Sequence, residues 1–229
     1  MRRGVLALVL CATLVASACT RTDQGVPTSD GERRAATATY EMPTSETDPP
    51  DPQEGDEPGV VPTMAPGAAG TVCAPPDLPP VRTVAQISDP AAPTATVGVP
   101  DGWSMSSGGG DPVGARLEGP SGMRATVTIA ATSLAPAAAF RRYSDDLTED
   151  SVVSTVSLLP GEMCGYSGQQ LMGILSDGTD TVQYEDRLVH VPAPAQDYLI
   201  AIHVEAPSDT PGFEDAASLV TGDFEIGLP

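Results

Sequence analysis

Apolar and polar residues alternate in short runs from Thr94 onward, and this period of two predicts β-strands. The first run stops at the turn signature Pro100-Asp101-Gly102, and the glycine-rich residues 106–112 predict a flexible loop. Residues 119–122 are expected to form one hairpin turn and residues 192–195 another. Strands are expected at 94–99, 103–105, 115–118, 124–129, 152–159, 170–175, 181–191 and 198–205.

The period changes to a helical one after Ala135. Pro136 suits a first helical turn, and Phe140, Tyr143 and Leu147 follow at positions that share one helix face. A helix that buries this stripe is therefore predicted. The acidic residues at its carboxyl end are poorly placed for the helix dipole and are expected in solvent.

A second helix is predicted close to the carboxyl end of the chain. Thr210 is expected to cap it, with Pro211 at its first position, and Gly222 is expected to end it. Its buried face is expected to carry Phe213, Ala217 and Val220. The two predicted helices are too few and lie too late in the chain to form repeated βαβ units. The predicted fold class is α+β, a single domain with an antiparallel β-sheet flanked by helices.

The amino terminus has the layout of an export signal. Met1-Arg2-Arg3 is a basic head, residues 4–15 form an apolar run too short to span a membrane, and Ala16-Ser17-Ala18 precedes Cys19. Ordinary secretion would use the three small residues as an A-x-A cleavage site. A cysteine directly after them instead resembles the lipobox of bacterial lipoproteins, although Ala16 replaces the usual leucine. We favour a lipoprotein signal at 1–19, with Cys19 acylated.

The residues that follow are acidic, proline-rich and poor in bulky apolar side chains. Such a composition does not bury enough surface to offset the entropy of ordering. Residues 20–71 are therefore expected to be a disordered tether, and residues 72–229 the folded domain. Two interpretations of the tether remain open: a spacer that crosses a cell wall, and a spacer without a specific partner.

The net charge of the chain limits the classes of partner that it can bind. The chain has 11 basic and 31 acidic residues, a formal charge of −20, and none of the basic residues is lysine. Nucleic-acid binding is excluded, because it needs a positive face that replaces phosphate counterions. Electrostatic docking on anionic lipids is disfavoured for the same reason. The membrane is expected to be reached through the lipid anchor alone.

Of the four cysteines, Cys11 leaves with the signal peptide and Cys19 is the expected lipid site. Cys73 and Cys164 remain as an even pair in an exported domain, which predicts one disulfide. Neither has a second cysteine or a histidine at metal-ligand spacing, so no metal site is expected. No cofactor is expected either.

Candidate catalytic residues are few. His190 and His203 are the only histidines, both within expected strands, and Glu185 or Glu205 could lie near His203. Catalysis would also need a nucleophile within reach, and no Gly-x-Ser-x-Gly motif is present. We interpret both histidines as structural and expect no catalytic residue.

Three further features have ordinary structural interpretations. Residues 177–180 lack the distant glutamate of a calcium loop and are expected to form a tight turn. The glycines at 108–110 do not have a phosphate-binding spacing. Trp103 could be a ligand platform, but a single tryptophan that begins a strand is more often part of the core.

An ordered series of short motifs covers most of residues 72–229. The series begins with Pro93-Thr94 and the Val99–Trp103 opening, and passes through the alanine-rich helix from Ala135. It continues with Leu159-Pro160-Gly161, Gly165-Tyr166, Arg187–Pro192, Tyr198–Ile202 and Ala206–Asp209. This ordered series resembles that of actinobacterial lipoproteins of the LpqN family. The resemblance implies a PsbP/Mog1-like α/β/α sandwich and a role in the cell envelope through protein partners. It supplies no catalytic motif.

The predicted function is that of a non-enzymatic cell-envelope lipoprotein. It would be held on the extracytoplasmic face of the cell membrane by Cys19, and its domain would bind envelope proteins. The alternative is a carrier of lipid or another apolar ligand, because a domain of this size can enclose an apolar pocket. The residues that would bind either ligand are not evident from the sequence.

Overall fold

The structure is a computed structural model that describes residues 57–68, 70–76 and 79–229. The expected signal peptide, the lipid site Cys19 and the tether residues 20–56 lie outside these residues. Within them, no helix combines the length and the apolar character needed to cross a membrane.

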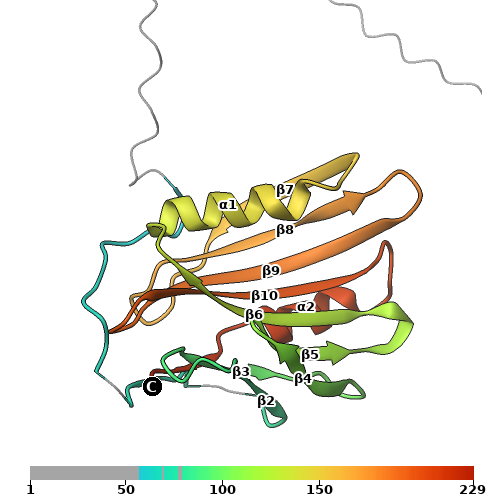
Figure 1. Ribbon diagram of the computed structural model, residues 1–229. Coiled ribbons are helices and arrows are strands. Elements are labelled where there is room, and N and C mark those ends of the chain that lie inside the picture. Colours follow the sequence, from blue (N-terminus) through green and yellow to red (C-terminus); the bar gives the residue numbers. More distant parts are fainter. Residues whose placement is uncertain (1–56, 69, 77–78) are drawn as a thin grey trace, which may run out of the picture. The chain divides into compact units, whose positions relative to one another are not determined.

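One large antiparallel sheet organises the domain (Figure 1). Its strand order, β4-β5-β6-β10-β9-β8-β7, follows from hairpins between neighbours in the sequence, apart from the pairing of β6 with β10. Its strands are β4 (Ser104–Gly110), β5 (Val113–Glu118), β6 (Arg124–Thr132), β7 (Val153–Pro160), β8 (Gly168–Ser176), β9 (Thr181–Pro192) and β10 (Asp197–Pro207).

A smaller antiparallel sheet has the order β1-β11-β3-β2. Its strands are β1 (Val72–Cys73), β2 (Arg82–Ala85), β3 (Thr94–Gly98) and β11 (Glu225–Gly227). The helical elements of the described residues are α1 (Pro136–Thr148), α2 (Phe213–Thr221) and the short 3₁₀ turn η1 (Pro120–Gly122).

The two helices cover opposite faces of the large sheet. Phe140 of α1 packs in one apolar cluster with Leu188 of β9, whereas Val189, the next residue along β9, packs in a second cluster with Phe213 and Val220 of α2. Successive strand residues point to opposite faces, so the layers run from α1 through the large sheet to α2 and the small sheet. The α+β class and the sheet flanked by helices are confirmed.

A disulfide links Cys73 in β1 to Cys164 in the connection between β7 and β8. It is the pair expected from the count of cysteines. The bond spans 91 residues of sequence and ties β1 of the small sheet to the β7–β8 connection of the large sheet.

The glycine-rich residues that were expected to form a loop belong to β4, which continues to Gly110. Gly108 explains the difference: a Cβ there would lie 1.5 Å from the carbonyl oxygen of Val113, so only glycine permits this close pairing with β5. The prediction of a loop was wrong because glycine marks close backbone approach as well as flexibility.

The start of α2 also differs from the expectation. The helix begins at Phe213, and Gly212 before it has a φ of 78°, a left-handed conformation that suits glycine. The Thr210 hydroxyl donates 2.7 Å to the carbonyl of Pro207, so it stabilises the preceding turn and does not cap the helix. Gly222 ends the helix as expected.

The folded domain begins earlier than residue 72. Residues 57–64, here called the strap, pack on the domain although they were assigned to the tether. The buried amide of Gln169 donates 2.9 Å to the carbonyl of Pro58, and the backbone of Gly168 donates 2.9 Å to that of Gly59. The buried Ser167 hydroxyl accepts the N–H of Val61. These bonds satisfy polar groups that would be costly to bury alone, and so hold a segment of unfavourable composition.

Candidate functional site

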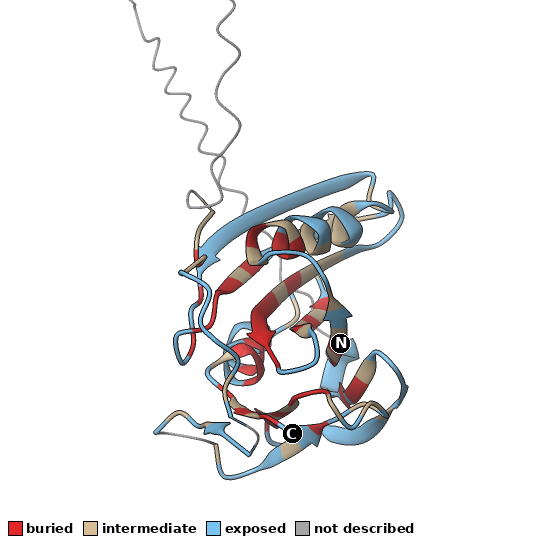
Figure 2. Ribbon diagram, turned by 60° about the vertical axis from the view of Figure 1, so that its left-hand side comes forward, coloured by how far each residue is buried: buried red, intermediate tan, exposed pale blue. Residues whose placement is uncertain are grey.

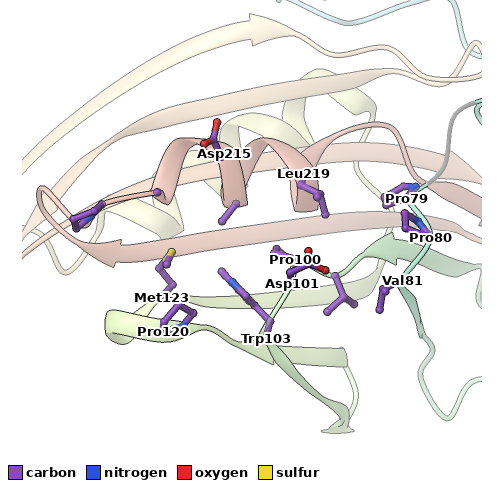
Figure 3. A pocket seen from close by; sticks show the side chains of 14 residues that line it. Pro79, Pro80, Val81, Pro100, Asp101, Trp103, Pro120, Met123, Asp215 and Leu219 are labelled. Carbon is purple, nitrogen blue, oxygen red and sulfur yellow. The ribbon is translucent and has the colours of Figure 1, made fainter.

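An open apolar groove of about 490 Å³ lies between α2 and the segments that lead into β2 and β4 (Figure 3). Its walls come from parts of the chain far apart in sequence: the residues before β2, the β3–β4 connection, η1 with Met123, and α2. Five of its lining residues are prolines, namely Pro79, Pro80, Pro100, Pro120 and Pro211. Proline rings restrict the backbone, so the walls of the groove are largely formed before any ligand arrives.

Trp103 forms part of the groove wall below α2. It is buried to 9% exposure in the same apolar cluster as Met123. A Cβ on Gly119 would lie 2.3 Å from the indole ring, so only glycine allows the chain to pass this close. In Figure 3 the indole lies beneath α2 beside Met123 and Pro120. Trp103 is therefore a core residue, as expected, and also part of the groove wall.

Another part of the wall comes from α2 and the chain before β2. Both Leu219 and Pro79 approach Gly98, where a Cβ would lie 2.8 Å and 2.7 Å from their side-chain carbons. Val81 continues this wall toward solvent and is 44% exposed. The groove therefore offers apolar side chains to solvent along its length.

Among the described residues that line the groove, the charged ones are both acidic. Asp101 and Asp215 are both exposed, and Asp101 lies between Trp103 and the Pro79–Val81 wall in Figure 3. The described part of the lining therefore combines an apolar floor with a negative rim. This chemistry suits an apolar ligand that carries positive charge at its margin.

His203 belongs to a different site, on the α1 face of the large sheet. Its cross-strand neighbour is Asp186, and its Nδ1 donates to Asp186 Oδ1 over 2.6 Å. Its Nε2 lies 3.6 Å from Glu205 Oε2, and the other oxygen of Glu205 accepts the guanidinium of Arg124. Charges of alternating sign therefore run from the buried Asp186 to the exposed Arg124.

The pKa values of His203 and Glu205 shift toward their charged forms, whereas the pKa of the buried Asp186 shifts the other way. Burial opposes protonation of His203, but hydrogen bonds to Asp186 and Glu205 raise its pKa to about 10. The bond from His203, with help from Arg124 and against burial, lowers the pKa of Glu205 to about 2. Burial raises the pKa of Asp186, and interactions with His203 and Tyr143 offset part of that rise. An imidazole that stays protonated at neutral pH does not act as a general base.

The stability of the domain is expected to depend on pH through His203. Its pKa is near 6.5 when unfolded and about 10 when folded, so its contribution is complete below pH 6.5 and is lost as the pH rises toward 10. The slope contributed by this group reaches about 1.4 kcal/mol per pH unit. Urea unfolding between pH 6 and 10 is expected to show this decline, and His203→Gln to remove most of it. An unchanged slope in the variant would contradict the assignment.

The other residues singled out from the sequence have separate places. His190 is buried, and its Nε2 lies 3.0 Å from the carbonyl of Leu134. Glu185 lies on the opposite face from His203 and accepts the hydroxyl of Thr221. Among the described residues, no serine hydroxyl hydrogen-bonds to either histidine side chain. Asp177 forms the expected turn, accepting the backbone N–H groups of Thr179 and Asp180.

Asp186 was not identified from the sequence, although a signal for it exists. The hairpin of β9 and β10 pairs Asp197 with Pro192, and continuing that register brings His203 opposite Asp186. Glu205 was named as a possible neighbour and does lie beside His203. The groove at α2 has no comparable signal, because its wall residues each appear in the sequence as ordinary turn or core residues.

No family model and no curated protein matches this sequence. Several solved structures are similar to the chain, and two of them are described below. One is LpqN, described as involved in cell envelope biogenesis of Mycobacterium tuberculosis, with 18% identity, a TM-score of 0.49, and coverage of 65% of this chain and 91% of LpqN. The other is cyanobacterial PsbP (CyanoP) from Synechocystis, with 10% identity, a TM-score of 0.38, and coverage of 74% of this chain and 99% of that one. At these identities, membership of the LpqN family stays a prediction.

Proposed function

We propose that this protein is a non-enzymatic lipoprotein of the cell envelope, held on the extracytoplasmic face of the membrane through Cys19. Its domain binds another envelope protein in the groove at α2. The signal layout and the cysteine after Ala18 support the anchor. The observation that carries the binding role is the open, proline-walled apolar groove with acidic residues alone at its rim.

The chemistry of the groove defines the partner. Trp103, Val81 and Leu219 offer apolar contacts along a channel open to solvent, which suits an extended segment of polypeptide. Asp101 and Asp215 favour a partner segment with arginine or lysine beside its apolar residues.

Photo-crosslinking in cells tests this role. A crosslinker placed at Asp101 is expected to capture a protein partner, and Val81→Asp is expected to lower the yield about tenfold by placing a carboxylate in the apolar channel. Val84→Asp is the matched control, because Val84 is 53% exposed on β2 and does not line the groove. Equal yields from both variants would exclude the groove as the binding site.

The apolar lining also supports a second role, the carriage of a lipid or another apolar ligand. A volume of about 490 Å³ falls within the range of small-molecule sites. Native mass spectrometry of the protein extracted from cells separates the two roles, since a carrier retains bound lipid that Val81→Asp releases. The same intact mass shows whether Cys19 carries acyl chains.

A further inference from the structure

The strand β7 ends the large sheet and is exposed along its whole length (Figure 2). It pairs with β8 on one side and with no other strand of the described residues. Its eight residues, Val153–Pro160, include no charged side chain. Exposed edges of this kind are normally blunted by charges, proline or bulges, because their free N–H and C=O groups pair readily with other strands.

The strand β4, at the opposite edge of the sheet, has an irregularity of the kind that blunts an edge. The pairing of β4 with β5 shifts register between Ser107 and Gly110, and three of the seven residues of β4 are glycine. The pairing of β7 with β8 has no such shift from Val153 to Pro160. The β4 edge therefore carries a register shift that the β7 edge lacks, and the proline of β7 stands only at its last residue.

The register identifies the groups that β7 offers to a partner. The N–H of Gly161 donates to the carbonyl of Gly168, which fixes the odd-numbered residues of β7 as those that bond to β8. The even-numbered residues Ser154, Val156 and Leu158 therefore direct their N–H and C=O groups outward. Proline at position 160 has no N–H to offer and limits the pairing at that end.

We propose that β7 pairs antiparallel with β7 of a second copy of this chain, about a two-fold axis at Val156. In this register Val156 lies opposite its own copy, and Ser154 lies opposite Leu158 of that copy. Each of these outward-facing pairs exchanges two hydrogen bonds. The same register places Val153 opposite Leu159, so apolar side chains meet on both faces of the joined sheet.

The exposed apolar surface around β7 supports this pairing. Val153 and Leu159 are 60% and 44% exposed on one face, where Met172 and Ile174 of β8 extend the patch at 36% and 43%. Val156 adds an exposed apolar side chain on the α1 face, at 36%. A two-fold interface requires one surface to complement itself, and an uncharged strand with apolar residues at both ends meets that requirement.

The acidic residues beside β7 determine how the affinity of the proposed dimer depends on salt. The proposed register brings Asp150 of one copy near Glu162 of the other at both ends of the joined strands. Both residues are exposed, so their repulsion is weak and screened by salt. The dimer is therefore expected to tighten as salt is raised, which also screens the formal charge of −20 on each chain.

Sedimentation equilibrium tests the pairing in the full mature chain with Cys19→Ser, so that no acyl chain contributes to association. A concentration-dependent dimer is expected. Val156→Pro removes the outward N–H of each copy at the axis, and Val156→Lys places two cations there; each is expected to raise the dissociation constant at least about tenfold. The matched control, Val84→Lys on β2, is expected to dimerise like the wild type. Circular dichroism verifies that each variant folds.

Charge exchange tests the register itself. Asp150→Lys alone, or Glu162→Lys alone, pairs opposite charges across the interface and is expected to tighten the dimer. The double variant restores like charges and is expected to lose that gain, whereas Glu214→Lys, on α2, has little effect. The proposal is overturned if the wild-type chain sediments as a monomer at every concentration. It is also overturned if β7 pairs with a different protein and not with a second copy of this chain. If the double variant dimerises more tightly than either single variant, the proposed register is wrong.

Discussion

Replacing both Cys73 and Cys164 by serine is expected to lower the free energy of unfolding by about 2–5 kcal/mol. The bond closes a loop across 91 residues, so its loss releases much conformational freedom in the unfolded chain. It also holds a weak part of the fold, because β1 and β11 contribute only two and three residues to the small sheet. Urea unfolding of the variant beside the oxidised wild type measures the loss.

Without the disulfide, the small sheet is expected to be the first part of the domain to lose stability. In hydrogen exchange, the amides of β1 and β11 should lose protection first, while those of β9 and β10 keep it, since the central strands lie within the apolar clusters. The wild type unfolded in the presence of reductant is the matched control and should behave like the variant. Equal unfolding midpoints for oxidised wild type and variant would show that the disulfide does not stabilise the domain.

Asp186→Ala is expected to lower the free energy of unfolding by about 3–5 kcal/mol, the range for a buried ion pair that loses one partner. The Asp186 side chain is fully buried, and its removal leaves the imidazolium of His203 without its shortest hydrogen bond. The pKa of His203 should fall in the variant, because Asp186 is the first of the groups that raise it. Thermal and urea unfolding measure the stability, and NMR titration of the imidazole measures the pKa.

Two further variants separate the charge effect from packing. Asp186→Leu combined with His203→Leu replaces the buried pair by apolar side chains and is expected to recover most of the lost stability. Asp146→Ala removes the partner of Arg142 in an exposed pair on α1 and is expected to leave stability close to that of the wild type. If the double leucine variant were as unstable as Asp186→Ala, packing would explain the loss in place of charge.

The long strands and both helices are predictable because each buries one face, and a buried face leaves a regular period in the sequence. Phe140 of α1 and Val220 of α2 lie in the two apolar clusters, as their spacing predicts. The strands β1 and β11 are too short for any alternation to be visible. They form because neighbouring strands and the disulfide hold them, which are tertiary causes.

The strap and the groove escape prediction for a related reason. The composition of residues 57–64 predicts an unpacked chain, and only the buried side chains of Ser167 and Gln169, more than a hundred residues away, give it hydrogen-bond partners. The groove joins walls from separate parts of the chain, so no local pattern marks it. Local sequence carries periodicity, whereas these sites depend on which distant residues meet.

Trp103 is the chain's single tryptophan, and it forms one wall of the groove. Indole emission from the unlabelled protein therefore arises at this one position and responds to the polarity around it. A segment that enters the groove displaces water beside the ring, and its arrival is visible as a spectral change without any attached dye. The domain thus carries its own optical reporter for titrations with candidate partners.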